Sequence, residues 1–248
     1  IMECIGPRLG RTRKTVLPQL EMAFPDKTPQ ARAAIMRKMW NNMGRVFAEY
    51  AHLAQIAAER MTVVGGEYLQ TARQADRPVI FVAGHIGNWE LMSVVIKNAG
   101  IPLHVVYRAP NNPWVGAVLH RARRVGADGR QIAKGASGAR QILSVMRHKG
   151  AVGMLVDQRL TGGAKVTFFG RPAETAPAVA LFADKYKAQV HYIRVERLSG
   201  AHFRVTVSPE VIVPSDQTVF LQQINDELER WVRVHPSQWL WTHRRWQA

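Results

Sequence analysis

The sequence predicts an α/β fold, a single domain in which a central, largely parallel mixed sheet is flanked by helices. Short apolar runs typical of buried strands alternate with segments of helical periodicity along the chain. The chain has 248 residues, a length that suits one sizeable domain. Its hydrophobic content of 47% is normal for a globular protein and argues against disorder.

The N-terminal segment predicts a linker followed by a long helix. Residues 1–27 are basic and contain several Pro and Gly, so we interpret them as a connector leading from something upstream. Residues 28–248 form the predicted domain. Thr28 and Pro29 suit the N-cap and first position of a helix whose apolar residues recur at helical spacing through residue 54. We expect this stripe to pack on the core, with a membrane-facing stripe as the alternative.

The rest of the chain alternates between the two kinds of element. Apolar runs predict strands at 78–82, 103–107, 151–156, 189–195 and 202–207. Helices are predicted near 89–98, 113–124, 137–148, 177–187 and 216–233, before an aromatic tail. No run of eighteen apolar residues is present, so no segment of this sequence is expected to span a bilayer.

The charge balance points to an anionic partner. Lys and Arg number 34 against 18 Asp and Glu, a net charge of +16. Such a surface attracts nucleic acid, anionic lipid or an acidic protein, and it is also compatible with a merely solvated surface. No recognised nucleic-acid-binding motif is present, so we expect no nucleic-acid partner. The single cysteine, Cys4, excludes an intrachain disulfide and a Cys-based metal site.

The most specific local motif is G-H-I-G-N-W-E at 84–90, between a predicted strand and a predicted helix. Ligand sites of open α/β sheets gather at such strand ends. If Asn88 caps the helix, Glu90 lies in its first turn and can reach His85 on the loop. A carboxylate beside an imidazole makes a general base suited to a hydroxyl acceptor. A turn histidine and a carboxylate that only complements the helix dipole are the structural alternatives.

Other kinds of chemistry find less support in the sequence. Neither an H-E-x-x-H motif nor a second histidine at helical spacing from His85 is present, so no metal site is predicted. A G-x-S-x-G elbow is also missing, and Cys4 is remote from any His-rich loop. These features favour direct attack by the acceptor over an acyl-enzyme intermediate.

The 84–90 segment resembles the H-x4-[DE] motif of glycerolipid-type acyltransferases, and more narrowly the lipid A biosynthesis acyltransferases. Further blocks are similar to that family in the same order: A-F-P-D at 23–26, V-Y-R-A-P-N-N-P at 106–113, D-Q-R at 157–159, F-F-G at 168–170, T-A-P at 175–177 and H-P-S-Q-W-L-W-T-H-R-R-W at 235–246. The motif has Glu where many relatives of the wider superfamily have Asp. The F-P-E-G-T-R signature of glycerol-phosphate acyltransferases is absent, as is the family's usual N-terminal membrane helix.

The resemblance implies a glycerolipid-acyltransferase-like fold and an acyltransferase. The donor would be an acyl carrier protein thioester, and the acceptor a hydroxyl of an anionic lipid A precursor. His85 would deprotonate that hydroxyl, Glu90 would balance the imidazolium, and backbone N–H groups of the glycine turn or an Arg would bind the oxyanion. No metal or bound organic cofactor is implied. The enzyme would work at the cytoplasmic face of a Gram-negative inner membrane.

Further residues complete the predicted site. The substrate-binding residues would be Asn88, Arg108, Asp157, Arg159, Phe168 and Phe169. Arg108 and Arg159 follow predicted strands and suit a phosphorylated glucosamine, or else form structural ion pairs, for instance of Arg159 with Asp157 or Glu90. Asp157 is expected to be a structural partner rather than a second base. The two phenylalanines line an acyl channel or belong to the core.

Two questions stay open at the level of sequence. The aromatic and basic tail suits a membrane interface, or packs on the domain as a helix. A phosphatidylinositol mannoside acyltransferase that uses a coenzyme A thioester shares the motif and the fold. A non-catalytic, basic membrane-binding domain is the third reading.

Overall fold

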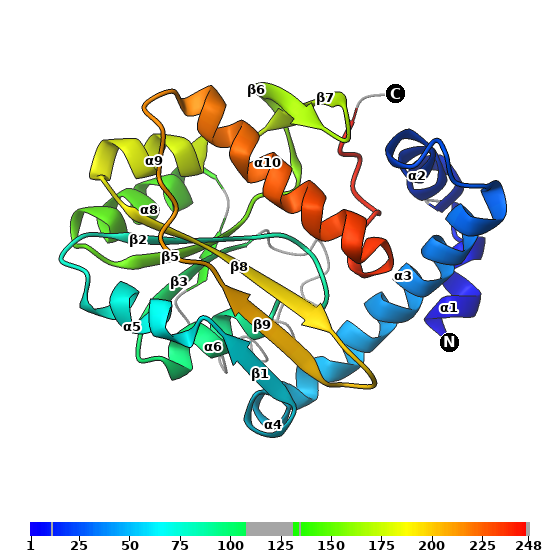
Figure 1. Ribbon diagram of the computed structural model, residues 1–248, viewed down its shortest axis with the longest axis horizontal. Coiled ribbons are helices and arrows are strands. Elements are labelled where there is room, and N and C mark those ends of the chain that lie inside the picture. The colour runs from blue at the N-terminus through cyan, green and yellow to red at the C-terminus, as the bar shows by residue number, and fades with distance from the viewer. Residues whose placement is uncertain (11, 108–130, 134, 247–248) are drawn as a thin grey trace.

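A central sheet organises the molecule. The computed structural model describes residues 1–248 except 11, 108–130, 134 and 247–248. In this described part, seven strands form a sheet in the order β1-β9-β8-β2-β5-β3-β4, with helices on both faces (Figure 1). Neighbouring strands are parallel except β8 and β9, which are antiparallel. The predicted fold class is confirmed.

The predicted strands are present. The sheet consists of β1 (Met61–Val64), β2 (Val79–Ala83), β3 (Leu103–Tyr107), β4 (Gln131–Ala133), β5 (Ala151–Leu155), β8 (Gln189–Arg197) and β9 (Phe203–Val207). Apolar runs in the sequence predict β2, β3, β5, β8 and β9. Strands β1 and β4 were not predicted, because they lie at the two edges of the sheet and are short, so neither carries a long apolar run.

The strands divide the core into two layers because successive side chains point to opposite faces. In β2, Ile80 and Val82 join the cluster covered by α8, α9 and α10, whereas Val79, Phe81 and Ala83 join the cluster covered by α4, α5 and α6. The helices are α4 (Leu53–Glu59), α5 (Gly66–Gln74), α6 (Leu91–Asn98), α8 (Ala136–Arg147), α9 (Ala178–Tyr186) and α10 (Gln217–Val234). The helix predicted at 113–124 lies outside the described residues.

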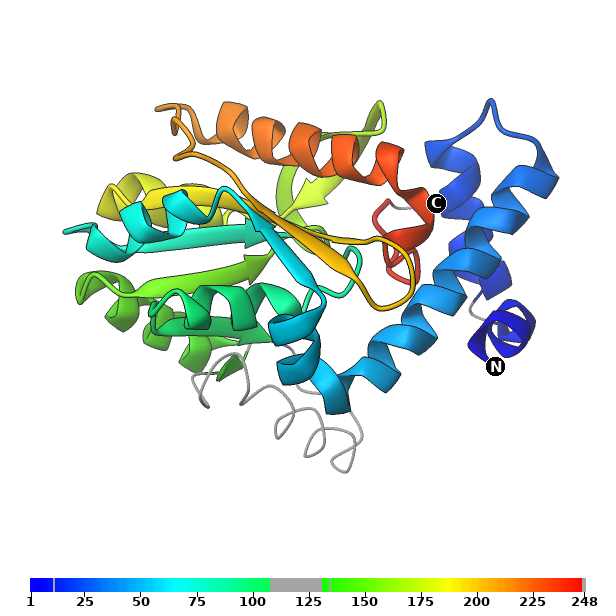
Figure 2. The same cartoon turned by 60° about the horizontal axis from the view of Figure 1, so that its bottom comes forward.

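The N-terminal segment packs onto the rest of the molecule. Within the segment interpreted as a connector, α1 (Met2–Ile5) and α2 (Leu17–Ala23) form, and Val16 and Leu20 are fully buried in the core. They precede α3 (Pro29–Glu49), which lies beside them at one end of the molecule (Figure 2).

Helix α3 confirms the predicted N-terminus and the packed stripe. Thr28 caps the helix and accepts a hydrogen bond from the N–H of Ala31 at 3.2 Å. Met39 and Val46 are buried on its inner face, whereas Phe47 is 50% exposed. No helix among the described residues is long and apolar enough to cross a bilayer.

The C-terminal tail packs into the molecule against a hairpin. Strands β6 (Arg159–Phe168) and β7 (Arg171–Thr175) form an antiparallel hairpin beside α10. The side chains of Trp239, Trp241 and Trp246 are 2%, 0% and 4% exposed, so they face the core rather than a membrane. Of the two alternatives for the tail, packing on the domain is therefore present, but the described part is irregular apart from a 3₁₀ turn at Pro236–Gln238 and is not a helix.

Candidate active site

His85 lies at the carboxyl end of β2 and is bound to the end of the neighbouring strand. Because β2 and β5 are parallel and adjacent, the loops that follow them meet at one edge of the sheet. The backbone N–H of His85 donates to Oδ2 of Asp157 at 2.8 Å, and Nδ1 of its ring lies 2.7 Å from Oδ1 of the same carboxylate. One carboxylate therefore fixes both the loop backbone and the ring.

Asp157 is held as a carboxylate. Its side chain is 3% exposed, and Oδ2 also accepts a hydrogen bond from Nε1 of Trp239 at 2.7 Å. Burial by itself would raise the pKa of Asp157, but the adjacent His85 and these hydrogen bonds outweigh it and hold the pKa well below its ordinary value. A charged Asp157 favours a proton on Nδ1 of His85, which leaves Nε2 with a lone pair.

Three partly buried side chains surround the imidazole. The indole of Trp89 meets it edge-on, with ring centroids 5.1 Å apart. The amide nitrogen of Gln158 lies 3.3 Å from Nε2 of His85 and 2.8 Å from Nε2 of His243. The His85 side chain is 14% exposed, so the imidazole is not sealed in the core. Such an imidazole can remove a proton from a hydroxyl bound at Nε2.

Glu90 is not the carboxylate found at Nδ1 of His85, which corrects the prediction from spacing. Its Oε1 accepts hydrogen bonds from the Tyr50 hydroxyl at 2.7 Å and from Nε1 of Trp89 at 3.0 Å. The helix begins at Leu91, so Glu90 occupies the N-cap rather than the first turn. A carboxylate from the adjacent strand, 72 residues away in sequence, takes the predicted place.

Asn88 lies under the loop rather than in a substrate site. It is fully buried, and its amide nitrogen donates to Oε2 of Glu49 at 2.9 Å. Its Oδ1 accepts the N–H of Glu90 at 3.3 Å. Asn88 therefore does bond a backbone N–H ahead of the helix, as a capping residue would, but its side chain is directed toward α3.

Glu49 belongs to a buried ion pair that supports the loop from below. The guanidinium of Arg197 donates to both oxygens of Glu49 and, through Nε, to Oδ1 of Asn42 at 2.7 Å. Asn42 in turn donates to the carbonyl of Gly87 at 3.0 Å. Gly87 has φ of +62°, and a Cβ there would overlap the carbonyl oxygen of Val195. The turn of the motif thus needs glycine for its conformation and for its close packing.

Arg159 forms an ion pair, the structural alternative named from the sequence, but with Glu174 rather than with Asp157 or Glu90, and it also lines a pocket. Its Nε donates to Oε2 of Glu174 at 2.6 Å. The pocket has a volume of about 380 Å³ and is lined by Arg159, Lys165, Pro172, Glu174, Arg245 and Trp246. Burial lowers the pKa of Arg245 to about 10, against the attraction of Asp157, so the residue stays charged near neutral pH. Arg108, the other predicted phosphate ligand, lies outside the described residues.

Phe168 and Phe169 belong to the core. They are 1% and 6% exposed, and Phe168 stacks on Trp246 with ring centroids 5.7 Å apart. The structure supports the core alternative over a channel lining. Nothing in the sequence indicated that Gln158 and His243 lie beside His85, although D-Q-R at 157–159 and the segment 235–246 both resemble family blocks. In the described ranges, no group of three His, Cys, Asp or Glu residues is placed to hold a metal ion.

Comparisons with known proteins identify relatives over nearly the whole chain. Residues 2–248 match the sequence model of a family described as "Bacterial lipid A biosynthesis acyltransferase". The chain is 23% identical to a lipid A biosynthesis acyltransferase of Haemophilus influenzae, covering 96% of this chain and 76% of the relative. It is 24% identical to the lipid A biosynthesis palmitoleoyltransferase of Escherichia coli, covering 98% and 81%. It is also 24% identical to the myristoyltransferase of that organism, covering 94% and 75%.

Proposed function

Since this chain belongs to the bacterial lipid A biosynthesis acyltransferase family, a family of acyl-transferring enzymes, we propose that it moves a fatty acyl chain from an acyl carrier protein thioester to a hydroxyl of a lipid A precursor. The observation that carries the mechanism is the bond between Nδ1 of His85 and the buried carboxylate of Asp157. It supports an imidazole whose Nε2 is a base at a partly exposed site.

In this mechanism the acceptor hydroxyl binds at Nε2 of His85. The imidazole takes the hydroxyl proton as the oxygen attacks the thioester carbonyl carbon. The tetrahedral intermediate then collapses, the carbon–sulfur bond breaks, and the imidazolium returns its proton to the leaving sulfur. Asp157 keeps the ring in the required tautomer and balances its charge in between. Glu90 acts indirectly, because its hydrogen bond holds Trp89 against the imidazole.

The cationic pocket supports an anionic acceptor. Arg159 follows Gln158 in sequence, and Arg245 lies two residues after His243, so two residues of the pocket lining are close in the chain to side chains that contact or neighbour His85. Arg159, Lys165 and Arg245 outnumber the single carboxylate of Glu174 in its lining. Arg and Lys suit the phosphate of a phosphorylated sugar, and we assign the headgroup of the acceptor to this pocket.

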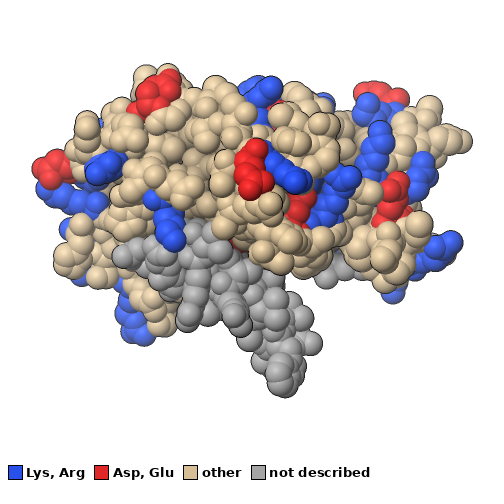
Figure 3. Space-filling view, turned by 90° about the horizontal axis from the view of Figure 1, so that it is seen from below, with Lys and Arg blue, Asp and Glu red and all other residues tan. Residues whose placement is uncertain are grey.

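We further propose that the enzyme acts at the cytoplasmic face of the inner membrane. The N-terminal segment exposes Ile5 and Leu9 at 49% and 41% together with basic Arg8 and Lys14. Figure 3 shows Lys and Arg, with a few Asp and Glu among them, on the end of the molecule that carries α3, as well as at the other end. A basic surface with exposed apolar side chains suits an anionic lipid surface, and the acyl carrier protein is itself expected to be acidic.

The test is acyl transfer by the purified chain, followed by mass spectrometry of the acceptor. With acyl carrier protein thioester and a lipid A precursor, the product should gain one acyl chain. His85→Ala should lower kcat by about 10²–10⁴-fold, because the general base is lost, whereas His148→Ala, at an exposed histidine that caps the C-terminus of α8, should leave it unchanged. Full activity of His85→Ala would refute the mechanism.

The same assay tests the donor and the acceptor. Coenzyme A thioesters replace the carrier protein in one arm, and a phosphatidylinositol mannoside replaces the lipid A precursor in another. We expect the carrier protein and the lipid A precursor to give the higher kcat/KM. Preference for coenzyme A and the mannoside would favour that alternative acyltransferase.

A further inference from the structure

The mechanism above uses Nε2 of His85 but not the group that already lies against it. The amide nitrogen of Gln158 lies 3.3 Å from that atom and 2.8 Å from Nε2 of His243. A carboxamide NH₂ carries two donor hydrogens, and Nε2 of a Nδ1-protonated imidazole is an acceptor. Gln158 therefore spans the two rings, whose centroids are 5.8 Å apart.

Neighbouring hydrogen bonds fix the positions of both Gln158 and His243. Gln158 directly follows Asp157, whose bonds to His85 hold the end of β5 in place. The tail around His243 is anchored on its other side by Gln19, which donates to the carbonyl of Trp241 at 2.9 Å and to that of His243. The N–H of Leu240 also donates to the carbonyl of His85 at 3.0 Å. His243 is therefore held at a set distance from the loop.

The transition state needs hydrogen-bond donors, and three N–H groups of the glycine turn are already used. The N–H of His85 donates to Asp157, that of Ile86 to the carbonyl of Gly84, and that of Gly87 to the carbonyl of Gln238. The family resemblance implied backbone N–H groups of the glycine turn or an Arg as oxyanion donors, and these three N–H groups of the turn are occupied. A side-chain donor next to Nε2 of His85 is the alternative that the structure supplies.

We propose that the carboxamide of Gln158 donates to the oxyanion of the tetrahedral intermediate, and that His243 is the positioning residue that holds this carboxamide. The inference rests on the proposed acyl transfer. When the acceptor hydroxyl takes the place at Nε2 of His85, one N–H of Gln158 loses its acceptor and faces the reacting carbonyl oxygen. The other N–H stays bound to Nε2 of His243 and keeps the carboxamide from rotating.

Single variants test the donor. Gln158→Ala should lower kcat by about 10²–10³-fold, the usual loss on removing one oxyanion donor, with a much smaller change in KM. Gln158→Glu should be at least as poor, because a carboxylate repels the oxyanion. Gln223→Ala, at an exposed position on α10, is the matched control and should retain wild-type kcat. An unchanged kcat for Gln158→Ala, with His85→Ala inactive, would overturn the inference and leave the proposed function standing.

A double-mutant cycle tests the link to His243. His243→Ala should lower kcat by about 10-fold or more, and His243→Gln should recover part of it, because a carboxamide oxygen can accept the same N–H. The double variant Gln158→Ala/His243→Ala should be no slower than Gln158→Ala alone, since His243 acts through Gln158. Losses that multiply would assign His243 a separate or merely structural role. Circular dichroism and Tm of each variant exclude unfolding as the cause.

Discussion

At the scale of single residues, Asp157 fixes the chemistry because three donors share its two oxygens. The backbone and ring of His85 and the indole of Trp239 all bind this one buried side chain. Its negative charge, and not only its shape, sets which ring nitrogen of His85 carries the proton.

Asp157→Asn separates charge from shape. The amide NH₂ would face Nδ1 of His85 and favour a proton on Nε2, which removes the base. We expect kcat to fall by about 10³–10⁴-fold, as for loss of the orienting carboxylate in a Ser-His-Asp triad, while the fold is kept. Steady-state kinetics with Tm measures both. An active Asp157→Asn variant would show that the carboxylate is dispensable.

His191 provides a pH dependence of stability away from the site. It is fully buried, its Nδ1 lies 2.8 Å from the carbonyl of Ser208, and Nε2 has no hydrogen-bond partner among the described residues. Burial lowers the pKa of His191, against opposing effects of Ser208 and Glu210. The folded state thus resists protonation, so the free energy of unfolding should fall as pH drops below the unfolded histidine pKa of about 6.5 and on toward the lower pKa of the folded state.

The measurement is urea unfolding of the wild type and of His191→Phe between pH 5 and 8. Phe replaces a ring already stacked on Phe81, with centroids 5.8 Å apart, and it cannot titrate. The difference in unfolding free energy between the two proteins should change with pH in favour of the variant in acid. A difference that is constant with pH would show that His191 does not titrate differently in the folded state.

Of the residues around the imidazole, His85 could be predicted from the sequence, but its contacts could not. His85 could be found because a short loop after a strand carries it. Its partner could not, because spacing compares neighbours in sequence, whereas Asp157 comes from a strand that becomes adjacent only when the sheet forms. Neither Gln158 nor His243 has a chemical signature on its own, so their contact is visible only in three dimensions.

At the scale of elements, the loop between β2 and α6 depends on a glycine. Gly87→Ala would place a Cβ against the carbonyl of Val195 and strain a φ of +62°. We expect a loss of more than about 2 kcal/mol of unfolding free energy, because steric overlap adds to the cost of a left-handed conformation. Denaturant unfolding measures it.

Gly200→Ala is the matched control for this prediction. Its φ is +57°, but nothing lies within 4 Å of an added Cβ. It should cost only about 1 kcal/mol, the conformational part alone. Equal losses at the two positions would mean that the overlap with Val195 relaxes at no cost.

The elements that the sequence missed share a physical cause. The hairpin of β6 and β7 packs on α10, and alternate residues of β6 stay exposed, so no continuous apolar run marks it. The N-terminal helices α1 and α2 are short and depend on packing against the tail and α3. Apolar runs, by contrast, identified the interior strands, most clearly β2 and β5, which are buried on both faces.

At the scale of the whole molecule, the two ends of the described chain are joined by Gln19. This buried side chain bonds the carbonyls of Trp241 and His243 and accepts the N–H of Arg245. Gln19→Ala would leave these backbone groups unsatisfied and should cost about 2–4 kcal/mol. It should also lower kcat, because the tail carries His243.

The exposed Gln55→Ala on α4 is the control and should change neither quantity. Urea unfolding and steady-state kinetics of the two variants measure the loss of stability and of kcat. If Gln19→Ala lost stability but kept the wild-type kcat, the position of His243 would not depend on the hydrogen bonds of Gln19.

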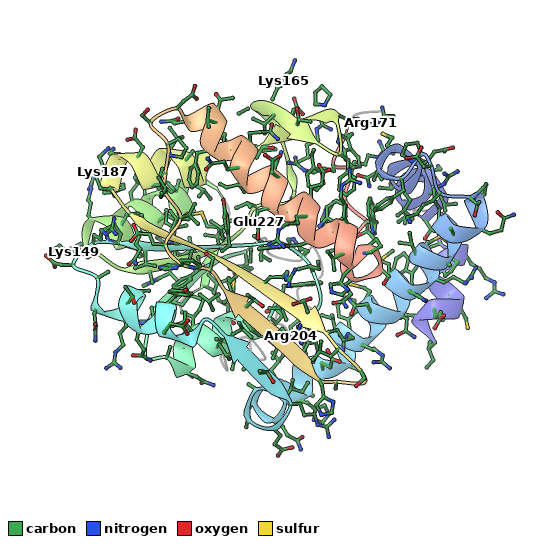
Figure 4. All side chains as sticks on the ribbon, viewed as in Figure 1. Lys149, Lys165, Arg171, Lys187, Arg204 and Glu227 are labelled. Carbon is green, nitrogen blue, oxygen red and sulfur yellow. The ribbon has the colours of Figure 1, made fainter. Side chains whose placement is uncertain are left out.

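Two lysines in different parts of the molecule allow a test of whether the pocket lined by Arg159, Lys165 and Arg245 binds the acceptor headgroup. Lys165 and Arg171 lie on the hairpin, whereas Lys149 and Lys187 lie at the opposite end of the molecule (Figure 4). Removing Lys165 should raise KM for an anionic acceptor if the pocket holds its headgroup. Removing Lys187 changes the net charge equally, so it reports the general attraction of the basic surface instead.

Against the effect of burial, the adjacent His85 and the hydrogen bonds hold the pKa of Asp157 below its ordinary value, so this carboxylate stays ionised in mild acid. Mild acid should therefore leave intact the hydrogen bonds that Asp157 accepts from the backbone and ring of His85 and from the indole of Trp239. If turnover falls at low pH, the hydrogen bonds around His85 should still be formed. Returning the sample to neutral pH should then restore turnover without refolding.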